Sequence, residues 1–597
     1  MTTGDVNLVE AGRYAGMTEV ALPSVRRRSA HWLITLLLVA GALRLASPTG
    51  WIGSDDVAYH AAAEHVLVNA PMDRVHHQFA RSPIVLMTAA AMWAGGANVA
   101  ALLLPSFVLS LLTVVVVVEI GTILWNRSVG LTAGTVMAFI PVFVNHSTAV
   151  LPGTYTCFFS GVALLLVLVG ARRRFAGKLL TCSILAGLFA GAAISTKLFA
   201  GGVCVAMAAA VAASTGWSRR WWMAATGAVA GIALFVLLEC AFYRYHAGSW
   251  FYKFSAMSSA RAAHSMGNFH SAAYTDMWST LQLVWQRMTM TLRPTFSGLG
   301  WFGCLLMPAV AWSAFADRRA LPLVCWILVT YLGVGFLPIS IENGIHVFPP
   351  GFFDGVNLMV LCVPASLCVS RLLFAVTAAI PGLGSRVLIR RWPVVLVLVV
   401  AVSSWSRWTY GQRTRLPQQE LAVAMSQIAD RADFRDGESI YVLPSIYWRY
   451  RLMFPEKLRE RLRVVADADA PDWWKAACPD IEERYVTLPQ SPEGYLIATP
   501  DQFFGDGHYW DYGVGFPDSV NAWRSIAPTM HVSRQGRVDK MKSESNGRSQ
   551  SATSASPSDQ AIRDAASAVP ADPQAARIKA LLFVIDGGRS PNALAHR

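Results

Sequence analysis

Residues 98–124 read NVAALLLPSFVLSLLTVVVVVEIGTIL, a run in which Glu119 is the one ionisable side chain. A helix needs roughly 17–25 such residues to cross the hydrocarbon core of a bilayer. The whole chain of 597 residues has the same character, since 54% of its residues are hydrophobic and 15% are charged. An ordinary soluble domain has about 25% charged residues. So few charges cannot cover a surface that faces water, and the sequence therefore predicts an integral membrane protein.

Further apolar runs are long enough to cross a bilayer by the same criterion. With residues 98–124 they give about 11 predicted transmembrane helices, and the others lie at about 31–47, 130–147, 152–170, 179–196, 198–215, 221–242, 298–315, 321–339, 351–375 and 392–409. The run at 83–94 is shorter. Its length suits a helix that lies at the interface better than one that crosses the membrane.

Short basic blocks between the apolar runs predict which loops face the cytoplasm, because Lys and Arg are enriched on that side. The blocks lie at 26–28, 172–178, 219–220, 317–319 and 386–391. All of them fall on one side if 83–94 does not cross. The prediction is then a cytoplasmic segment at 1–30 and a transmembrane core at 31–409, with long outer loops at 48–97 and 243–297. We interpret the net charge of +13 as a sign of this topology and of contact with anionic membrane lipids, not of nucleic-acid binding.

The chain beyond residue 409 has a different composition. Residues 410–530 mix charged residues with strand-like pieces at 439–443, 462–465 and 484–488 and a helix-like piece at 418–431. They predict a mixed α/β soluble domain on the outer face. Residues 531–597 are rich in Ser, Ala, Gln, Asp and Pro, which predicts a largely disordered tail. Eight of the nine Cys lie in apolar runs, so no disulfide framework is expected.

Two adjacent carboxylates, Asp55 and Asp56, follow the first predicted span, within the sequence GSDDVAYH at 53–60. Ionisable groups at the membrane boundary are costly to bury and are often functional. Such a pair can act as a general base or hold a cation. In the alternative interpretation, the loop is solvated and one Asp caps the helix that follows. A helix beginning here would present its positive end to the pair.

Arg81 stands two residues before Pro83, where the interfacial helix is expected to begin. A guanidinium pairs with phosphate oxygens through two parallel hydrogen bonds, so Arg81 suits a lipid phosphate. The alternative is an ordinary contact with lipid headgroups. His76 and His77 lie nearby, but no third metal ligand is evident beside them, so we interpret them as surface histidines.

This order of features resembles the GT-C superfamily of glycosyltransferases, which use polyprenyl-phosphate sugars. The acidic pair after the first span, the basic residue before a proline-led helix and the outer C-terminal domain carry the resemblance. It is nearest to bacterial relatives of protein O-mannosyltransferases and aminoarabinose transferases. Weaker similarities lie at 131–141, 187–197 and 346–358, and the resemblance covers about residues 30–410.

The resemblance implies roles for particular residues. Asp55 corresponds to the catalytic base of the family, with Asp56 beside it. Residues implied to bind the donor phosphate are Arg81, Lys197 and His346, the last standing where relatives often carry Arg. Residues implied to assist are Glu64, His264 and His270.

One position departs from the family pattern. Relatives often carry a Pro-Asp pair at the start of the fourth span, where this chain has Pro152 and Gly153. The second carboxylate is therefore missing, which implies that acceptor recognition differs or that Asp56 and Glu64 take over part of its role.

The implied function is transfer of a sugar from a polyprenyl-phosphate donor to a glycan, lipid or protein acceptor, on the outer face of a bacterial inner (plasma) membrane. A carboxylate base would direct an attack that inverts the anomeric carbon. No cofactor is required, although a divalent metal ion is compatible with this chemistry. The first alternative is a multi-spanning transporter or lipid flippase, but transporters tend to carry ionisable groups near the bilayer midplane. Here most ionisable residues lie at the outer boundary, although Glu119 and Glu239 lie inside apolar runs. A non-catalytic assembly or receptor protein is the second alternative.

Overall fold

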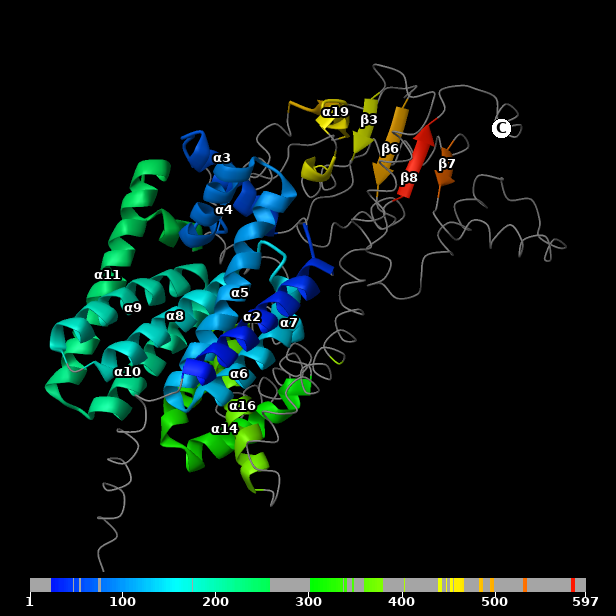
Figure 1. The fold of residues 1–597 in the computed structure, drawn as a ribbon. Coiled ribbons are helices and arrows are strands. Elements are labelled where there is room, and N and C mark those ends of the chain that lie inside the picture. Colours follow the sequence, from blue (N-terminus) through cyan, green and yellow to red (C-terminus); the bar gives the residue numbers. More distant parts are fainter. Residues whose placement is uncertain are drawn as a thin grey trace, which may run out of the picture.

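The computed structural model describes part of the chain. The described residues are 23–46, 48–52, 55–72, 77–173, 175–257, 301–336, 338–340, 346–347, 359–379, 402, 439–442, 447, 451–454, 456–465, 483–486, 494–498, 530–533 and 581–585. Most of them form a helical bundle, and a small β-sheet lies beside one end of it (Figure 1).

Among the described residues, six helical segments are long and apolar enough to cross a membrane. They are α5 (Val99–Leu124), α8 (Pro152–Arg172), α9 (Ala176–Thr196), α10 (Gly202–Thr215) with the 3₁₀ turn before it, α11 (Arg219–Ala247) and α16 (Cys362–Ala379) with the 3₁₀ turn Met359–Leu361. The expectation of an integral membrane protein is confirmed. The number of spans, predicted as about 11, stays a prediction.

Other helices occupy most of the remaining predicted spans. They are α2 (Pro23–Ala46), α6 (Arg127–Phe139), α14 (Trp301–Ala316) and α15 (Leu321–Phe336). Residues 130–147 were expected to form one continuous helix, but the helix is interrupted at Ile140, where α6 ends and the short α7 (Pro141–His146) begins. Proline disfavours a helical backbone at the residue before it, and Ile140 has ψ 121°. The predicted span at 392–409 lies outside the described residues except for Val402.

Glycines let helices α9 and α11 approach each other closely. A Cβ atom on Gly187 would lie 2.1 Å from the carbonyl oxygen of Ala228, and one on Gly231 would lie 2.0 Å from that of Ile184. Small residues at such contacts are typical of helix packing in membranes. This contact holds the first half of α11 against the middle of α9.

Two short helices precede α5. Helix α3 (Asp55–Leu67) begins at the acidic pair, and α4 (Ser82–Gly95) begins directly after Arg81 with Pro83 in its first turn. The start of α4 lies one residue before Pro83, where the sequence predicts it. Proline at the first turn is favourable because its missing N–H would have no partner there.

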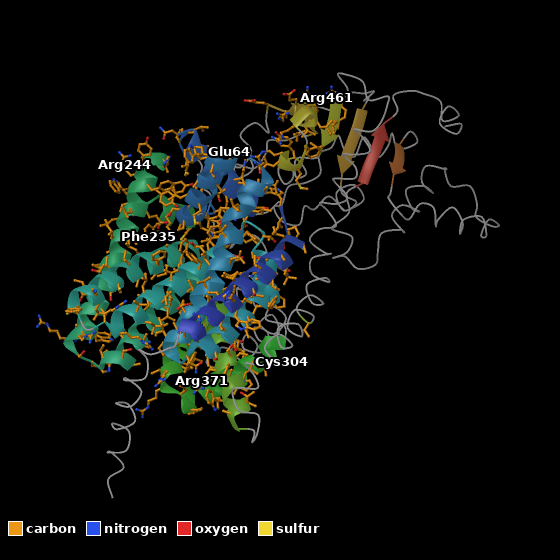
Figure 2. All side chains as sticks on the ribbon, viewed as in Figure 1. Glu64, Phe235, Arg244, Cys304, Arg371 and Arg461 are labelled. Carbon is orange, nitrogen blue, oxygen red and sulfur yellow. The ribbon has the colours of Figure 1, made fainter. Side chains whose placement is uncertain are left out.

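The two ends of the bundle carry different residues. Glu64 and Arg244 lie at one end, and Arg371 and Cys304 lie at the opposite end (Figure 2). Arg371 Nε donates to Asp317 Oδ2 at 2.7 Å, so the predicted cytoplasmic loop at 317–319 belongs to the second end. Glu64, from the predicted outer loop at 48–97, and the predicted cytoplasmic loop at 317–319 thus lie at opposite ends of the bundle.

The described strands beyond residue 438 form one six-stranded sheet, in the order β5-β4-β3-β6-β8-β7. The strands are β3 (Ser439–Val442), β4 (Leu462–Val465), β5 (Tyr485–Val486), β6 (Gly494–Ala498), β7 (Met530–Ser533) and β8 (Leu581–Ile585). Strands β3, β4, β5 and β6 pair in parallel, whereas β8 pairs antiparallel with β6 and β7. The apolar residues at 581–585 thus have sheet partners although they lie in the predicted tail. The domain boundaries stay a prediction, and the helix-like piece at 418–431 lies outside the described residues.

A smaller two-stranded antiparallel sheet joins β1 (Pro338–Ser340) to β2 (His346–Val347). The eight cysteines among the described residues are all free, as the composition predicts. Cys478 lies outside the described residues.

Candidate functional site

Asp55 is the first residue of α3. Its carboxylate makes polar contacts with two side chains but remains partly exposed. Gln78 Nε2 donates to Asp55 Oδ1 at 2.9 Å, and Arg81 Nη1 lies 3.5 Å from Asp55 Oδ2. The Asp55 side chain remains 31% exposed. The structure therefore brings the predicted base and the predicted phosphate-binding cation into one site.

Asp56 has a different environment from its neighbour. It is buried, and its Oδ2 accepts a hydrogen bond from the backbone N–H of Ile52 at 2.6 Å. Its Oδ1 accepts from the N–H of Val57 at 3.1 Å. A carboxylate bonded to N–H groups at a helix start stabilises that start. The capping interpretation of the acidic pair thus fits Asp56, whereas the open carboxylate is that of Asp55.

Tyr59 links Arg81 to α3. It lies one turn after Asp55, so both side chains are on one face of the helix. Arg81 Nη1 donates to the Tyr59 hydroxyl oxygen, and the guanidinium carbon lies 5.8 Å from the centre of its ring. Burial raises the pKa of Tyr59 well above its ordinary value, so the hydroxyl stays protonated. Arg81 is thus held between a phenol and a carboxylate, with its side chain 22% exposed.

Glu64, predicted to assist, contacts the segment that follows β3. Its Oε2 lies 3.7 Å from Arg451 Nη2 and 3.5 Å from Nδ1 of the buried His60. Burial lowers the pKa of His60 to about 3, and the charges of Arg451 and Arg459 act in the same direction. Glu64 therefore joins α3 to the sheet-bearing part of the chain, at the opposite end of the helix from Asp55.

Lys197 follows the last residue of α9, with its backbone N–H bonded to the carbonyl of Ala193. Its charge lies within electrostatic reach of His146 and Cys157. Since His146 ends α7 and Cys157 is in the second turn of α8, Lys197 lies near the turn that joins these two helices.

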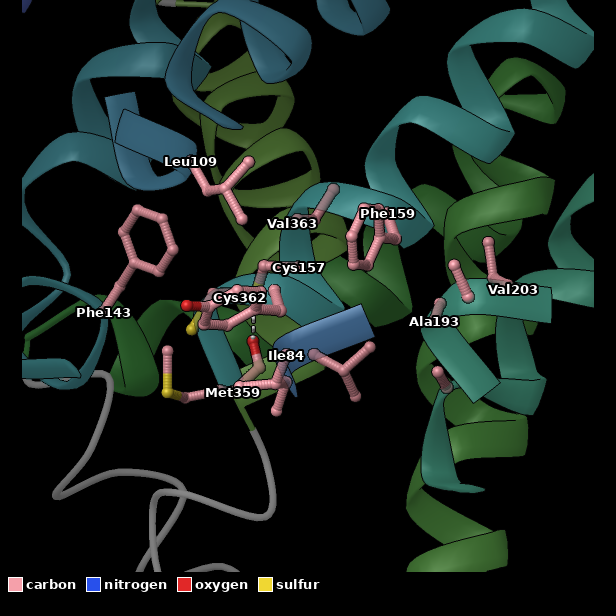
Figure 3. Packing of buried hydrophobic residues seen from close by; sticks show 14 of the residues in the cluster. Ile84, Leu109, Phe143, Cys157, Phe159, Ala193, Val203, Met359, Cys362 and Val363 are labelled. Atoms are coloured by element: carbon pink, nitrogen blue, oxygen red, sulfur yellow. Dashed lines mark hydrogen bonds between the residues drawn. The ribbon is translucent and has the colours of Figure 1, made fainter. Parts of the chain in front are cut away.

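Gly153, where the family pattern has Asp, is closely covered by Met359. A Cβ atom at this position would lie 2.3 Å from Met359 Sδ and 3.2 Å from Met359 Cβ. Cys157 Sγ also donates to the carbonyl oxygen of Met359 at 3.0 Å (Figure 3). Any side chain at position 153 would require Met359 to move. Met359 therefore occupies the space that the family's Asp side chain would need.

The remaining predicted site residues are only partly described. His264 and His270 lie outside the described residues, and His346 is described only as the first residue of β2. Within the ranges that the structure describes, no three His, Cys, Asp or Glu side chains gather as a metal site would require. The roles of these residues stay predictions.

The sequence-based prediction did not include two residues that contact the site, namely Tyr59, which contacts Arg81, and Gln78, which contacts Asp55. Tyr59 had a usable signal, because a helix that begins at Asp55 places residue 59 on the same face. Gln78 had none, because its contact with Asp55 depends on how the chain returns from α3 to α4.

Residues 82–242 match the family model described as dolichyl-phosphate-mannose-protein mannosyltransferase. The predicted resemblance is confirmed. The matched residues begin directly after Arg81 and run from α4 to α11, within the predicted resemblance over about residues 30–410. At the level of enzyme class, the prediction of a glycosyltransferase is confirmed. A comparison with curated proteins gives no match.

Solved structures with a similar arrangement include two states of one bacterial protein. ArnT from Cupriavidus metallidurans in the apo state is 15% identical, over 80% of this chain and 94% of its own, with a TM-score of 0.49. The same protein bound to undecaprenyl phosphate is 12% identical, over 84% and 96%, with a TM-score of 0.49. The oligosaccharyltransferase of Archaeoglobus fulgidus in complex with Zn and sulfate is 10% identical, over 79% and 68%, with a TM-score of 0.42.

Proposed function

We propose that this chain transfers a sugar from a polyprenyl-phosphate donor to an acceptor at the outer face of the membrane, with Asp55 as the base. The observation that carries the proposal is the pairing of a partly exposed carboxylate, Asp55, with a guanidinium, Arg81, which directly precedes the segment that matches the mannosyltransferase family. The name of that family supports a lipid-phosphate sugar as the donor class.

In this proposal the donor phosphate binds Arg81, and the acceptor hydroxyl approaches Asp55. The hydroxyl proton passes to an Asp55 oxygen while the acceptor oxygen forms a bond to the anomeric carbon. The bond between that carbon and the phosphate oxygen breaks, and its electron pair leaves on the phosphate. Attack from the side opposite the leaving group inverts the anomeric carbon. Arg81 stabilises the charge that develops on the phosphate, where such stabilisation contributes most to the rate.

The contact between Arg81 and Asp55 supports an order of binding. Arg81, which would bind the phosphate, contacts both Asp55 Oδ2 and the Tyr59 hydroxyl through one nitrogen, Nη1. A phosphate would compete for that nitrogen and release Asp55 Oδ2 toward an acceptor. Donor binding would therefore precede acceptor activation.

Other parts of the proposal follow the predicted topology. Lys197 and His346 would supply further positive charge to the donor phosphate, and the acceptor is a glycan, a lipid or a protein. The enzyme would reside in a bacterial inner membrane with the sheet-bearing part outside. It needs no nucleotide, and a divalent metal ion is compatible with the proposed chemistry; turnover measured with and without a chelator tests whether a metal ion takes part.

The test is release of polyprenyl phosphate from a panel of radiolabelled polyprenyl-phosphate sugars by the full chain in detergent, with a membrane lipid extract as acceptor. Release with at least one donor, and none from Asp55→Asn, is the expected result. Exchange of an intact donor lipid across vesicle membranes without cleavage would instead indicate the transporter alternative.

A further inference from the structure

Glu239 is a buried carboxylate in the apolar helix α11, with 7% of its surface exposed. A buried charge is tolerated only when it is paired and hydrogen-bonded. Lys253 Nζ lies 2.9 Å from Glu239 Oε2 and 3.1 Å from Oε1, and Ser82 Oγ donates to Oε1 at 2.6 Å. Ser195 Oγ donates to the same oxygen. Four segments of the chain therefore meet at one side chain.

Tyr243 lies one helical turn after Glu239, on the same face of α11. It is buried, and its hydroxyl donates to the carbonyl oxygen of Phe79 at 3.1 Å. Glu239 holds Ser82, the residue after Arg81, and Tyr243 holds Phe79, two residues before Arg81. Helix α11 thus fixes the backbone on both sides of Arg81.

We infer that Glu239 and Tyr243 are positioning residues for Arg81, which set the place of its guanidinium at the donor phosphate. Neither contacts Asp55 or Arg81 through a side-chain hydrogen bond given by the structure, so both act through the backbone at 79–82. The inference rests on the proposed function, in which Arg81 binds that phosphate.

Lys253 is the charge partner of Glu239 in this arrangement. Its Nζ also donates to Ser195 Oγ at 2.7 Å, so its bonds are made to α9 and α11. Burial lowers the pKa of Lys253, and Glu239 acts against that effect. The charge of Arg81 also lies within electrostatic reach of Lys253. The cluster therefore borders the site that contains Arg81.

The first test measures binding of undecaprenyl phosphate to the full chain in detergent, for the wild type and Tyr243→Phe. Loss of one hydrogen bond should weaken binding about threefold to tenfold. The matched control is Tyr245→Phe on the same helix, whose side chain is 71% exposed and which should bind as the wild type does.

The same pair of variants in an Arg81→Ala background distinguishes a positioning role from a structural one. If Tyr243 acts through Arg81, Tyr243→Phe has no further effect on binding in that background, while its effect on heat stability persists. Equal weakening in both backgrounds, or wild-type binding by Tyr243→Phe, overturns the inference. A wild type that does not bind undecaprenyl phosphate at all overturns the proposed donor class itself, and the two failures are therefore distinct.

A second set of variants addresses Glu239 directly. Glu239→Gln keeps an oxygen that can accept from Ser82, whereas Glu239→Ala removes it, so binding should be closer to wild type in the Gln variant. The control is Glu119→Gln, which breaks an ion pair with Arg127 in a different part of the bundle and should leave binding unchanged. Equal binding by the Gln and Ala variants would contradict the positioning role of Glu239.

Discussion

Acidification should destabilise the folded protein through His60. This histidine is fully buried in α3, with the ring of Trp51 at 6.2 Å and the charges of Arg451 and Arg459 nearby. Burial, followed by those charges, lowers its pKa from about 6.5 to about 3. The carboxylate of Glu64, 3.5 Å away, favours the protonated ring but does not reverse the shift.

The size of the effect follows from the two pKa values. The unfolded chain takes up the proton near pH 6.5, whereas the folded chain takes it up only near pH 3. His60 therefore has little effect on stability above pH 6.5, and its contribution becomes unfavourable as the pH falls through that value. Each pH unit corresponds to about 1.4 kcal/mol. At pH 5 the folded state should have lost about 2 kcal/mol of unfolding free energy relative to pH 7.5.

The assay compares wild type with His60→Gln, which cannot titrate in this range. Both are heated in detergent at pH 7.5 and pH 5, and the monodisperse fraction is measured by size-exclusion chromatography. Acidification from pH 7.5 to pH 5 should lower the apparent Tm of the wild type by more than it lowers that of His60→Gln. An identical loss in the two proteins would refute the reasoning, because the titrating group would then lie elsewhere.

Three further predictions follow from single contacts. Arg81→Lys should weaken binding of undecaprenyl phosphate about tenfold, since a lysine cannot form two parallel bonds to phosphate; unchanged binding in an equilibrium assay would argue against Arg81 as the ligand. Glu64→Lys should lower the free energy of unfolding by about 1 kcal/mol or less because Glu64 is 40% exposed, whereas Arg451→Glu should lower it by more because Arg451 is buried, and the double charge reversal should recover part of the loss. Gly153→Ala should cost about 1–3 kcal/mol because its methyl group would meet Met359, and wild-type heat resistance would show that Met359 moves aside freely.

Local sequence signals predicted those parts of the fold that depend on residues close together in the sequence. The apolar runs located α5, α8, α9 and α11, because hydropathy over a helix length reflects contact with lipid or with other apolar helices. Pro83 located the start of α4 for a steric reason that a single residue carries. The break before Pro141 had the same kind of signal and was missed because the apolar run continues through it.

Contacts between distant segments could not be predicted in this way. The role of Asp56 depends on the backbone N–H of Ile52 and Val57, so an acidic pair alone does not indicate which carboxylate is open. Glu239 and Ser82 are 157 positions apart, and nothing in either local sequence indicates that they meet. The filling of the space at Gly153 likewise depends on Met359, which belongs to a different helical segment.

The central claim is that Asp55 acts as the base while Asp56 stabilises the start of α3. Its most direct test is sugar transfer by Asp55→Asn and Asp56→Asn, measured side by side with the same polyprenyl-phosphate donor and normalised to the folded protein. We predict that Asp55→Asn abolishes transfer at nearly wild-type heat stability, whereas Asp56→Asn lowers heat stability and keeps turnover in the fraction that folds. Turnover that survives in Asp55→Asn and is lost in folded Asp56→Asn would contradict the account.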